Sequence, residues 1–209
     1  MPNCLVADIY HGDRVSSFKK AQQSGLAGVI HKATTGATGK DPKYASRRSA
    51  ALNAGLLWGA YHWGTNSNVD RQLANFLSTA EPDERTLVAL DFEPDNPRTM
   101  ELDQAREFLE KISIKLGRKA VLYSGSLIKD RLGNRTNAFF GSHRLWLAQY
   151  GDNPTVQRSW SRYWLWQYTD GIHGPAPRTV PGIPGNSRGQ LDCNSFEGTA
   201  ARLAAGWAS

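Results

Sequence analysis

The chain has 209 residues, of which 40% are hydrophobic and 21% charged, and its formal net charge is +6. This is the composition of a globular protein that can bury a sizeable core, and it excludes collagen-like, coiled-coil and disordered chains. The basic balance favours polyanionic partners, but no stripe of Lys and Arg interleaved with aromatic residues stands out, so nucleic acid is not expected as a partner.

The sequence lacks the features of an exported or membrane-inserted protein. No apolar run is long enough to cross a bilayer. The first twenty residues pass from a short apolar stretch straight into polar sequence, unlike a signal peptide. We therefore expect synthesis in the cytoplasm without a signal peptide, and no stable insertion into a membrane.

Short apolar runs recur along the chain and predict buried strands. Most are separated by a stretch with a helical pattern. The eight runs lie at residues 4–10, 27–33, 56–63, 86–93, 119–125, 144–150, 163–169 and 188–194.

The segments between the earlier runs predict helices. Residues 41–55 begin with Asp41 as a candidate N-cap and Pro42 at the first helical position, and they end at Gly55, where a left-handed residue can close the helix. The other predicted helices, each with apolar residues at helical spacing, lie at residues 68–80, 102–117 and 195–207.

This alternation predicts an α/β protein whose parallel sheet is covered by helices. Eight strands suggest closure into a TIM-like barrel. The last three strands are too close together to hold full helices, and residues 171–190 form a long Gly- and Pro-rich loop that we expect to be functional or to wrap around the barrel. We predict one irregular barrel over residues 1–209, with no second domain.

Four acidic residues stand at the predicted strand ends: Asp8, Asp91, Glu93 and Asp192. In such barrels the active site lies at the C-terminal ends of the strands. Asp91 and Glu93 are two positions apart, so they share one face, with Cα atoms roughly 6.6 Å apart. Two carboxylates this close cannot both ionise freely, so one pKa should rise, and Glu93, with the longer side chain, is the expected general acid. A metal site or an ion pair with Lys32 remain alternative interpretations of the pair.

Aromatic and polar residues at the same strand ends are candidates for substrate contact. Paired carboxylates between aromatic walls are what glycoside hydrolysis requires. Burial in the core is the competing interpretation for each single aromatic residue. The candidate binding residues are Lys32, Tyr61, His62, Tyr123, Trp146, Gln149, Tyr150, Trp166 and Tyr168, and Trp63 is a further candidate for stacking.

An ordered series of short motifs resembles glycoside hydrolase family 25, the Chalaropsis-type lysozymes. The series reads "ADIYHG", "GVIHKATTG", "WGAYHW", "LVALDFE", "VLYSG", "LWLAQY", "LWQYT" and "LDCN", and it runs from Asp8 to Asn194. The D-x-E motif alone is unspecific, whereas the ordered series is specific. The resemblance implies a (β/α)5(β)3 barrel and an N-acetylmuramidase that cleaves the β-1,4 bond between N-acetylmuramic acid and N-acetylglucosamine.

The resemblance also implies roles for the four acids. Glu93 matches the family's general acid, Asp91 and Asp192 match the acids that flank the scissile sugar, and Asp8 matches the acid of the first strand. In a mechanism assisted by the substrate N-acetyl group, Asp91 or Asp192 positions the amide, and no metal or other cofactor is needed. The expected partner is bacterial peptidoglycan, and the expected state is a monomer. A phage or prophage endolysin that reaches the wall after release is the simplest biological role for such a protein.

Two positions depart from the family pattern. Tyr10, followed by His11, stands where the family usually has serine, and Lys32 stands in "HKATTG" where the family commonly has arginine. Both changes touch the rim, so they bear on subsite preference.

Three other functions are weighed against this one. The alternative from another class is a sugar- or wall-binding barrel without catalysis, which the presence of both Asp91 and Glu93 opposes. A chitinase-type motif would need an acid at position 89, which is Ala89. A zinc or magnesium hydrolase would need clustered ligands, and the five histidines are scattered.

The two cysteines are expected to be free thiols. Asp8 and Asp192 should lie at the same rim, which puts Cys193 near the top of its strand and Cys4 four residues below Asp8. That separation is roughly 13 Å, beyond disulfide reach.

Overall fold

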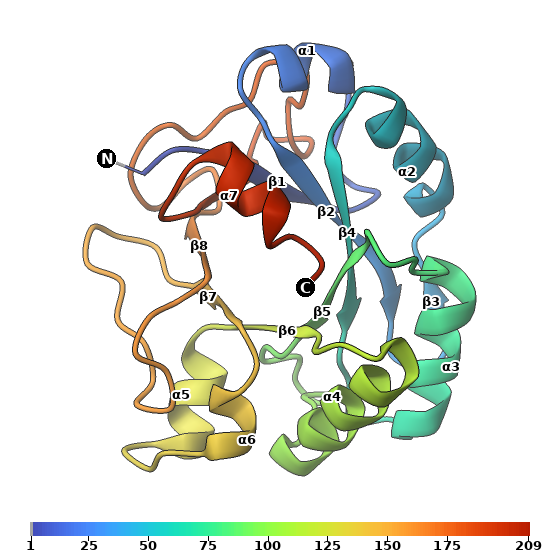
Figure 1. Ribbon diagram of the computed structural model, residues 1–209, viewed down its shortest axis with the longest axis vertical. Coiled ribbons are helices and arrows are strands. Elements are labelled where there is room, and N and C mark those ends of the chain that lie inside the picture. The colour runs from blue at the N-terminus through green and yellow to red at the C-terminus, as the bar shows by residue number, and fades with distance from the viewer. Residues whose placement is uncertain (1) are drawn as a thin grey trace.

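The apolar runs form the strands of a closed barrel in the computed structural model, which describes residues 2–209 (Figure 1). The sheet order is β1-β9-β8-β7-β6-β5-β4-β2-β3, and an additional β1–β2 pairing closes the ring, so that β3 lies outside it. The strands are β1 (Val6–Ile9), β2 (Gly28–Thr35), β3 (Gly39–Lys40), β4 (Leu57–Trp63), β5 (Leu87–Asp91), β6 (Val121–Ser124), β7 (Leu145–Ala148), β8 (Leu165–Thr169) and β9 (Asp192–Ser195). The predicted closed α/β barrel is confirmed.

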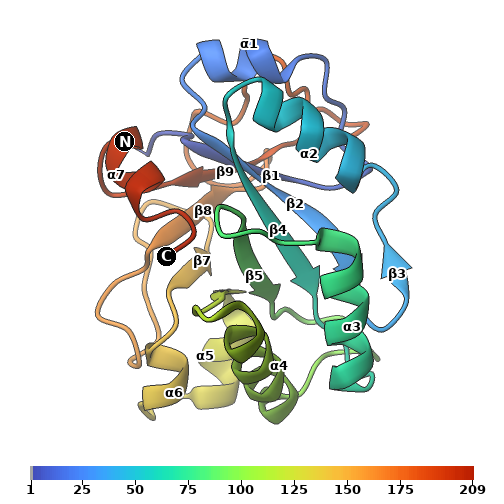
Figure 2. The same ribbon diagram turned by 45° about the vertical axis from the view of Figure 1, so that its right-hand side comes forward.

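Strand direction departs from the prediction at the end of the chain. The pairs from β1 through β8 around the ring are parallel, whereas β9 is antiparallel to both β1 and β8 (Figure 2). The predicted strand over 188–194 therefore begins later, at Asp192, and runs the other way. Asp192 still pairs with Asp8, because an antiparallel strand that starts at the C-terminal rim places its first residue there.

Strand β3 is absent from the sequence-based prediction. Its two residues pair with Thr34 and Thr35 in a short hairpin that extends β2 beyond the ring. A strand of this length has no apolar run to reveal it.

Helices cover the outside of the barrel along its first two thirds (Figure 1). Alternation along each strand separates an apolar layer inside the barrel from a larger one between the strands and the helices. The helices are α1 (Phe18–Gln23), α2 (Tyr44–Asn53), α3 (Val69–Ala80), α4 (Leu102–Leu116), α5 (Ser126–Leu132), α6 (Ala138–Gly141) and α7 (Ala200–Ala205). None of the helices in residues 2–209 is long and apolar enough to cross a membrane.

The helix predicted over 41–55 begins later than expected. Its N-cap position is Lys43, and the Asp41 side chain instead accepts hydrogen bonds from the backbone N–H groups of His11 and Lys43. Asp41 therefore ties the segment after β1 to the start of α2. Gly55 follows the helix with φ of 81°, in the left-handed region that glycine adopts readily.

The C-terminal segment closes the end of the barrel opposite the strands' C-terminal rim. Leu203 of α7 and Trp207 belong to the apolar layer inside the barrel. The Trp207 indole Nε1 donates a hydrogen bond of 2.7 Å to the carbonyl of Trp58 near the start of β4. This end is therefore filled by side chains rather than open.

The long loop 171–190 wraps over the segment between β1 and α1. Wrapping was one of the two roles predicted for this loop. Arg14 pairs with Gly185, and the carbonyl of Gly182 accepts hydrogen bonds from the backbone N–H groups of Ser16 and Ser17. The loop thereby fixes the chain that leads into β9.

Cys4 and Cys193 are both buried free thiols, as predicted, but the separation expected between them is wrong. Because β9 runs antiparallel to β1, Cys193 lies one step below the rim, paired with Ala7, and not above Asp192. The Cys4 thiol donates to the carbonyl of Val6 at 3.7 Å, and its proximity, together with burial, raises the pKa of the Cys193 thiol.

Candidate active site

A cavity of about 120 Å³ lies at the C-terminal ends of the parallel strands, where the sequence places the four acids. The side chains that line it come from strands β1, β4, β5, β6 and β7, from the residues just after β5 and β7, and from the first residue of β9. The lining residues are Asp8, Tyr61, Trp63, Asp91, Glu93, Tyr123, Trp146, Tyr150 and Asp192. The structure therefore brings the four acids around a single hollow.

The side chains of the D-x-E motif point in the directions that strand alternation predicts. Asp91 ends β5 on its inner face, Phe92 points outward into the buried layer under the helices, and Glu93 returns to the cavity. Phe92 N–H donates to the carbonyl of Tyr123 at 2.9 Å, and Ser124 Oγ donates to the carbonyl of Phe92 at 2.7 Å. These bonds to β6 hold the two carboxylates past the end of the regular strand.

Asp8 is held by neutral hydrogen-bond donors. Gln167 Nε2 donates to both carboxylate oxygens at 3.0 Å, and Asn194 Nδ2 donates to Oδ1 at 2.7 Å. The side-chain oxygen Oε1 of Gln167 in turn accepts hydrogen bonds from the hydroxyls of Tyr123 at 2.8 Å and Tyr150 at 3.0 Å. A single amide thus links Asp8 to two aromatic walls of the cavity.

Burial raises the pKa of all four carboxyl groups. It raises the pKa of Glu93 to about 7, with a further contribution from the negative charge of Asp8. It raises the pKa of Asp8 to about 6, against the hydrogen bonds from Asn194 and Gln167 that favour the ionised form. A group that titrates near 7 can hold a proton for donation and later accept one, which is what general acid–base catalysis requires.

Asp91 has an oxygen that no protein group satisfies. The residue is 3% exposed, and within residues 2–209 its Oδ1 has no hydrogen-bond partner. Burial and then the charge of Glu93 raise the pKa of Asp91, while the charge of Lys32 lowers it. A buried, unpaired acceptor is costly, and because Asp91 lines the cavity its Oδ1 is a candidate to accept a hydrogen bond from a substrate N–H.

Aromatic rings form the walls between the acids. Trp146 lies between Tyr61 and Tyr123, with ring centroids 6.4 Å and 4.4 Å away and both contacts edge-on. Its indole Nε1 donates to Asn194 Oδ1 at 2.6 Å. The rings are therefore fixed in orientation, so the hollow is shaped before any ligand enters.

Three predicted binding residues lie on the outer face of the barrel wall, away from the cavity. His62 is fully buried outside the barrel, where it contacts Thr34 and Gln72 and stacks on Phe108 with centroids 4.8 Å apart. Trp166 and Tyr168 belong to the same outer layer, on the opposite face of β8 from Gln167. Their selection was wrong because neighbouring residues on a strand point to opposite faces, and Tyr61 and Gln167 occupy the inner positions.

Gln149 also lies away from the cavity. Its side-chain oxygen Oε1 accepts hydrogen bonds from Lys129 Nζ at 2.6 Å and from the N–H of Thr155 at 3.1 Å. The side chain therefore stabilises the segment after β7. The main-chain carbonyl of Gln149 accepts the indole N–H of Trp166 at 2.7 Å. Both residues therefore support the rim rather than contact the hollow.

The two departures from the family pattern contact each other. Lys32 Nζ lies 4.8 Å from the ring centroid of Tyr10 and 5.4 Å from that of Trp63. Lys32 is not among the lining residues, but its charge reaches Asp91. Tyr10 and Lys32 thus form one cation–π unit at the edge of the site.

Gln167 and Asn194 are absent from the predicted binding set, although they hold Asp8. The signal for both was present. Gln167 is the polar residue within the apolar run 163–169, and Asn194 is two positions from Asp192 and so shares its face.

Comparison with known proteins agrees with this geometry. The profile described as "Glycosyl hydrolases family 25" matches residues 7–175. The chain belongs to glycosyl hydrolase family 25. It is a glycoside hydrolase of the lysozyme class, and its closed barrel is the fold of the family's solved structures.

Two curated relatives are lysozymes. Lysozyme M1 of Streptomyces globisporus is 26% identical over 213 residues, covering 95% of this chain and 69% of that protein. The autolytic lysozyme of Clostridium acetobutylicum is 28% identical over 179 residues, covering 81% of this chain and 53% of that protein. The chain thus spans about half of the second relative's length.

Solved structures match along almost the whole chain. The bacterial lysozyme of Streptomyces coelicolor superposes with a TM-score of 0.81 at 27% identity, covering 95% of this chain and 94% of that one. The muramidase of Acremonium alcalophilum gives a TM-score of 0.79 at 26% identity, covering 95% and 96%. The family 25 barrel is therefore matched on both chains nearly end to end.

Proposed function

We propose that this family 25 protein is an N-acetylmuramidase that cleaves the β-1,4 bond between N-acetylmuramic acid and N-acetylglucosamine in bacterial peptidoglycan. The observation that carries the proposal is the unpaired Oδ1 of Asp91 beside Glu93 in one aromatic-walled cavity. An acid that can donate a proton and an acceptor that can hold an amide N–H are the two groups that cleavage assisted by the substrate N-acetyl group needs.

Glu93 acts first as the general acid. Near neutral pH a large share of Glu93 is protonated, because its pKa lies at about 7. It donates this proton to the glycosidic oxygen as the bond to the anomeric carbon breaks. Glu93 is then a carboxylate and can take a proton from the attacking water, which returns the enzyme to its starting state.

Asp91 positions the substrate amide. Its free Oδ1 accepts the N–H of the 2-acetamido group, which turns the acetamido carbonyl oxygen toward the anomeric carbon. Attack by that oxygen displaces the protonated leaving group and gives a cyclic intermediate that water opens. Asp8, which is mostly ionised near neutral pH because its pKa is about 6, supplies negative charge near the developing positive charge on the sugar, and Asp192 lines the same cavity.

The aromatic walls bind the sugar rings. Tyr61, Trp63 and Tyr150 line the cavity beside the acids, and Lys32 sits over the Trp63 ring at the edge. We propose that the protein works as a monomer on wall glycan strands outside the cytoplasm, in the manner of a lysin. The catalytically inactive wall-binding barrel is the weaker candidate, because the full acid set is present.

The test is product analysis on purified peptidoglycan. We expect muropeptides with muramic acid at the reducing end, identified by mass spectrometry after borohydride reduction, together with loss of turbidity of a wall suspension. Products that end in reducing N-acetylglucosamine would contradict the bond assignment, and binding without turbidity loss would favour the inactive barrel.

A further inference from the structure

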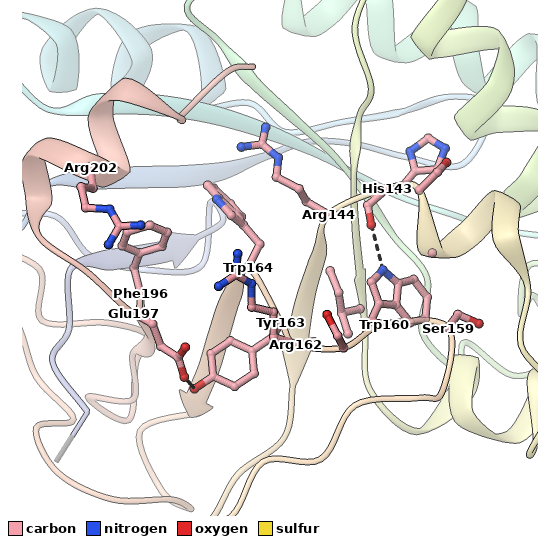
Figure 3. A pocket seen from close by; sticks show the side chains of 14 residues that line it. His143, Arg144, Ser159, Trp160, Arg162, Tyr163, Trp164, Phe196, Glu197 and Arg202 are labelled. Carbon is pink, nitrogen blue, oxygen red and sulfur yellow. Dashed lines mark hydrogen bonds between the residues drawn. The ribbon is translucent and has the colours of Figure 1, made fainter.

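A second cavity, larger than the catalytic one, lies elsewhere in the barrel. It has a volume of about 490 Å³, within the range of small-molecule sites. It is built by residues 141–145 at the start of β7, residues 159–164 before β8, residues 196–197 after β9, and Arg202 of α7 (Figure 3). It shares no lining residue with the catalytic cavity.

This basal pocket lies at the other end of the barrel from the acids. Strand β9 begins with Asp192 at the catalytic rim and ends with Ser195, next to Phe196 of the basal pocket. Three strand steps separate these ends by roughly 10 Å. The pocket therefore belongs to a separate surface, and the proposed hydrolysis does not use it.

Positive charge dominates the basal pocket. Arg144, Arg162 and Arg202 line it against a single carboxylate, Glu197. That carboxylate is engaged, because it accepts the hydroxyl of Tyr163 at 2.7 Å. The pocket thus has an excess of guanidinium groups over acids.

Two of the three guanidiniums are free to bind. Within residues 2–209, the side chains of Arg162 and Arg202 are exposed and make neither a hydrogen bond nor an ion pair. Arg144 is instead structural, because it donates to the carbonyls of Gly206 and Trp207 and lies 4.4 Å over the Trp164 ring. Arg162 and Arg202 are therefore the candidates for contact with an anion.

Aromatic rings give the basal pocket its walls. Trp164 packs edge-on against Phe196 with centroids 6.1 Å apart, and both are partly exposed. Trp160 is fixed by a hydrogen bond of 2.8 Å from its indole N–H to the carbonyl of His143 (Figure 3). Such walls suit a sugar or polyol chain that runs between charged groups.

We propose that the basal pocket binds a phosphate group of an anionic cell-wall polymer, a polyol or sugar phosphodiester, through Arg162 and Arg202. A guanidinium keeps its charge at any physiological pH and matches phosphate oxygens with two parallel N–H donors. A phosphodiester polymer carries a charge at every repeat, so neighbouring phosphates can also interact with a chain of net charge +6.

This inference rests on the proposed function only in taking the cell wall as the target. It would give a barrel two contacts with the wall, one for the glycan that is cut and one that holds the enzyme nearby. Such a second contact raises the local concentration of the enzyme without altering the chemistry.

The test compares two charge-reversal variants of equal net charge. Arg162→Glu/Arg202→Glu alters the basal pocket, and Arg71→Glu/Lys115→Glu alters exposed residues of α3 and α4 far from it in the sequence. Soluble poly(glycerol phosphate) is titrated at low ionic strength, followed by tryptophan fluorescence and calorimetry. Polyglutamate of similar charge serves as the carboxylate probe, and a thermal melt checks the fold of each variant.

We expect the pocket variant to bind poly(glycerol phosphate) about tenfold more weakly, and the control variant to lose about twofold at most. Polyglutamate binding should change equally little in both. An equal loss in the control, an equal loss for polyglutamate, or no binding by the unaltered protein would each overturn the proposal. Should charge reversal unfold the pocket variant, Arg162→Gln/Arg202→Gln is measured in its place against the same expectation.

Hydrolysis of a soluble glycan chain free of phosphate is measured on the same preparations. The unaltered protein tests the proposed muramidase activity, whatever the titration shows. A protein that cuts the glycan but ignores the phosphate polymer would overturn this inference alone.

Discussion

The cavities at the two ends of the barrel differ in volume, in charge and in how their side chains are held. The catalytic end holds a cavity of about 120 Å³ in which aromatic rings surround four carboxylates, one of which, Asp8, is held by two side-chain amides. The basal end holds about 490 Å³ lined by three arginines, two of which have no protein partner in residues 2–209. A small, pre-shaped hollow with raised pKa values is suited to chemistry, whereas a larger basic one is suited to attraction. Cavity size alone would have pointed to the wrong end.

The first prediction removes the proposed acid. Glu93→Gln should reduce hydrolysis about 10³-fold, because an amide cannot protonate the leaving oxygen, while binding at the basal pocket stays unchanged. The measurement is the turbidity rate, with Asp152→Asn on an exposed loop as the control. Full activity in Glu93→Gln would remove the acid from its role.

The same residue predicts a pH dependence of both rate and stability. The rate should fall as pH rises through about 7, because Glu93 loses the proton that it donates. Burial raises its pKa from 4.5 in an unperturbed group, so the folded state holds the proton more tightly than the unfolded state. Its contribution to stability is therefore full below pH 4.5 and lost as pH rises through 7.

Melting temperatures across that pH range test the sign of the effect. Glu93→Gln should show a smaller decrease with rising pH than the unaltered protein. A steeper decrease in the variant would contradict the raised pKa.

The second prediction tests the amide-positioning role. Asp91→Asn keeps the shape of the side chain but puts a donor in place of an acceptor, so the rate should fall about 10²-fold, mostly in kcat. The melting temperature should rise, because a buried carboxyl with an unpaired oxygen is removed. Steady-state kinetics on a soluble glycan separates the two constants. A change confined to KM would assign Asp91 to simple binding.

The third prediction concerns the support of Asp8. Gln167→Leu has a similar volume but removes the donor to both oxygens of Asp8, so the pKa of Asp8 should rise above its present value of about 6. We expect about a tenfold loss of rate and an upward shift of the acidic limb of the pH profile. A uniform loss at every pH would indicate a packing effect alone.

The smallest effect is expected at the rim. Lys32→Met removes the charge over Tyr10 and Trp63 and should raise KM about threefold, with kcat nearly unchanged. The pKa of Asp91 should rise further, because the Lys32 charge lowers it. Comparison with Lys32→Arg, which keeps the charge, distinguishes charge from shape.

Much of the catalytic end follows from local rules. The i, i+2 spacing of Asp91 and Glu93 predicts a shared face, and the structure has Phe92 pointing the other way, into the buried outer layer. The same rule, applied to β4 and β8, would have excluded His62, Trp166 and Tyr168 and selected Gln167. Those errors were errors of parity: His62 is the outward neighbour of Tyr61, and Trp166 and Tyr168 share the outward face of β8.

The sequence by itself determined the eight barrel strands, most of the helices and the gathering of the four acids. The reason is that the apolar periodicity of each segment, and the order of the segments along the chain, can be seen in the sequence directly. Only the tertiary structure decided that β9 runs antiparallel, that Cys193 therefore lies below the rim beside Ala7, and that Arg162 and Arg202 line one basal cavity. The physical reason is that these features depend on the path of long connections such as 171–190 and on which side chains close the base of the barrel. Local patterns carry no information about either.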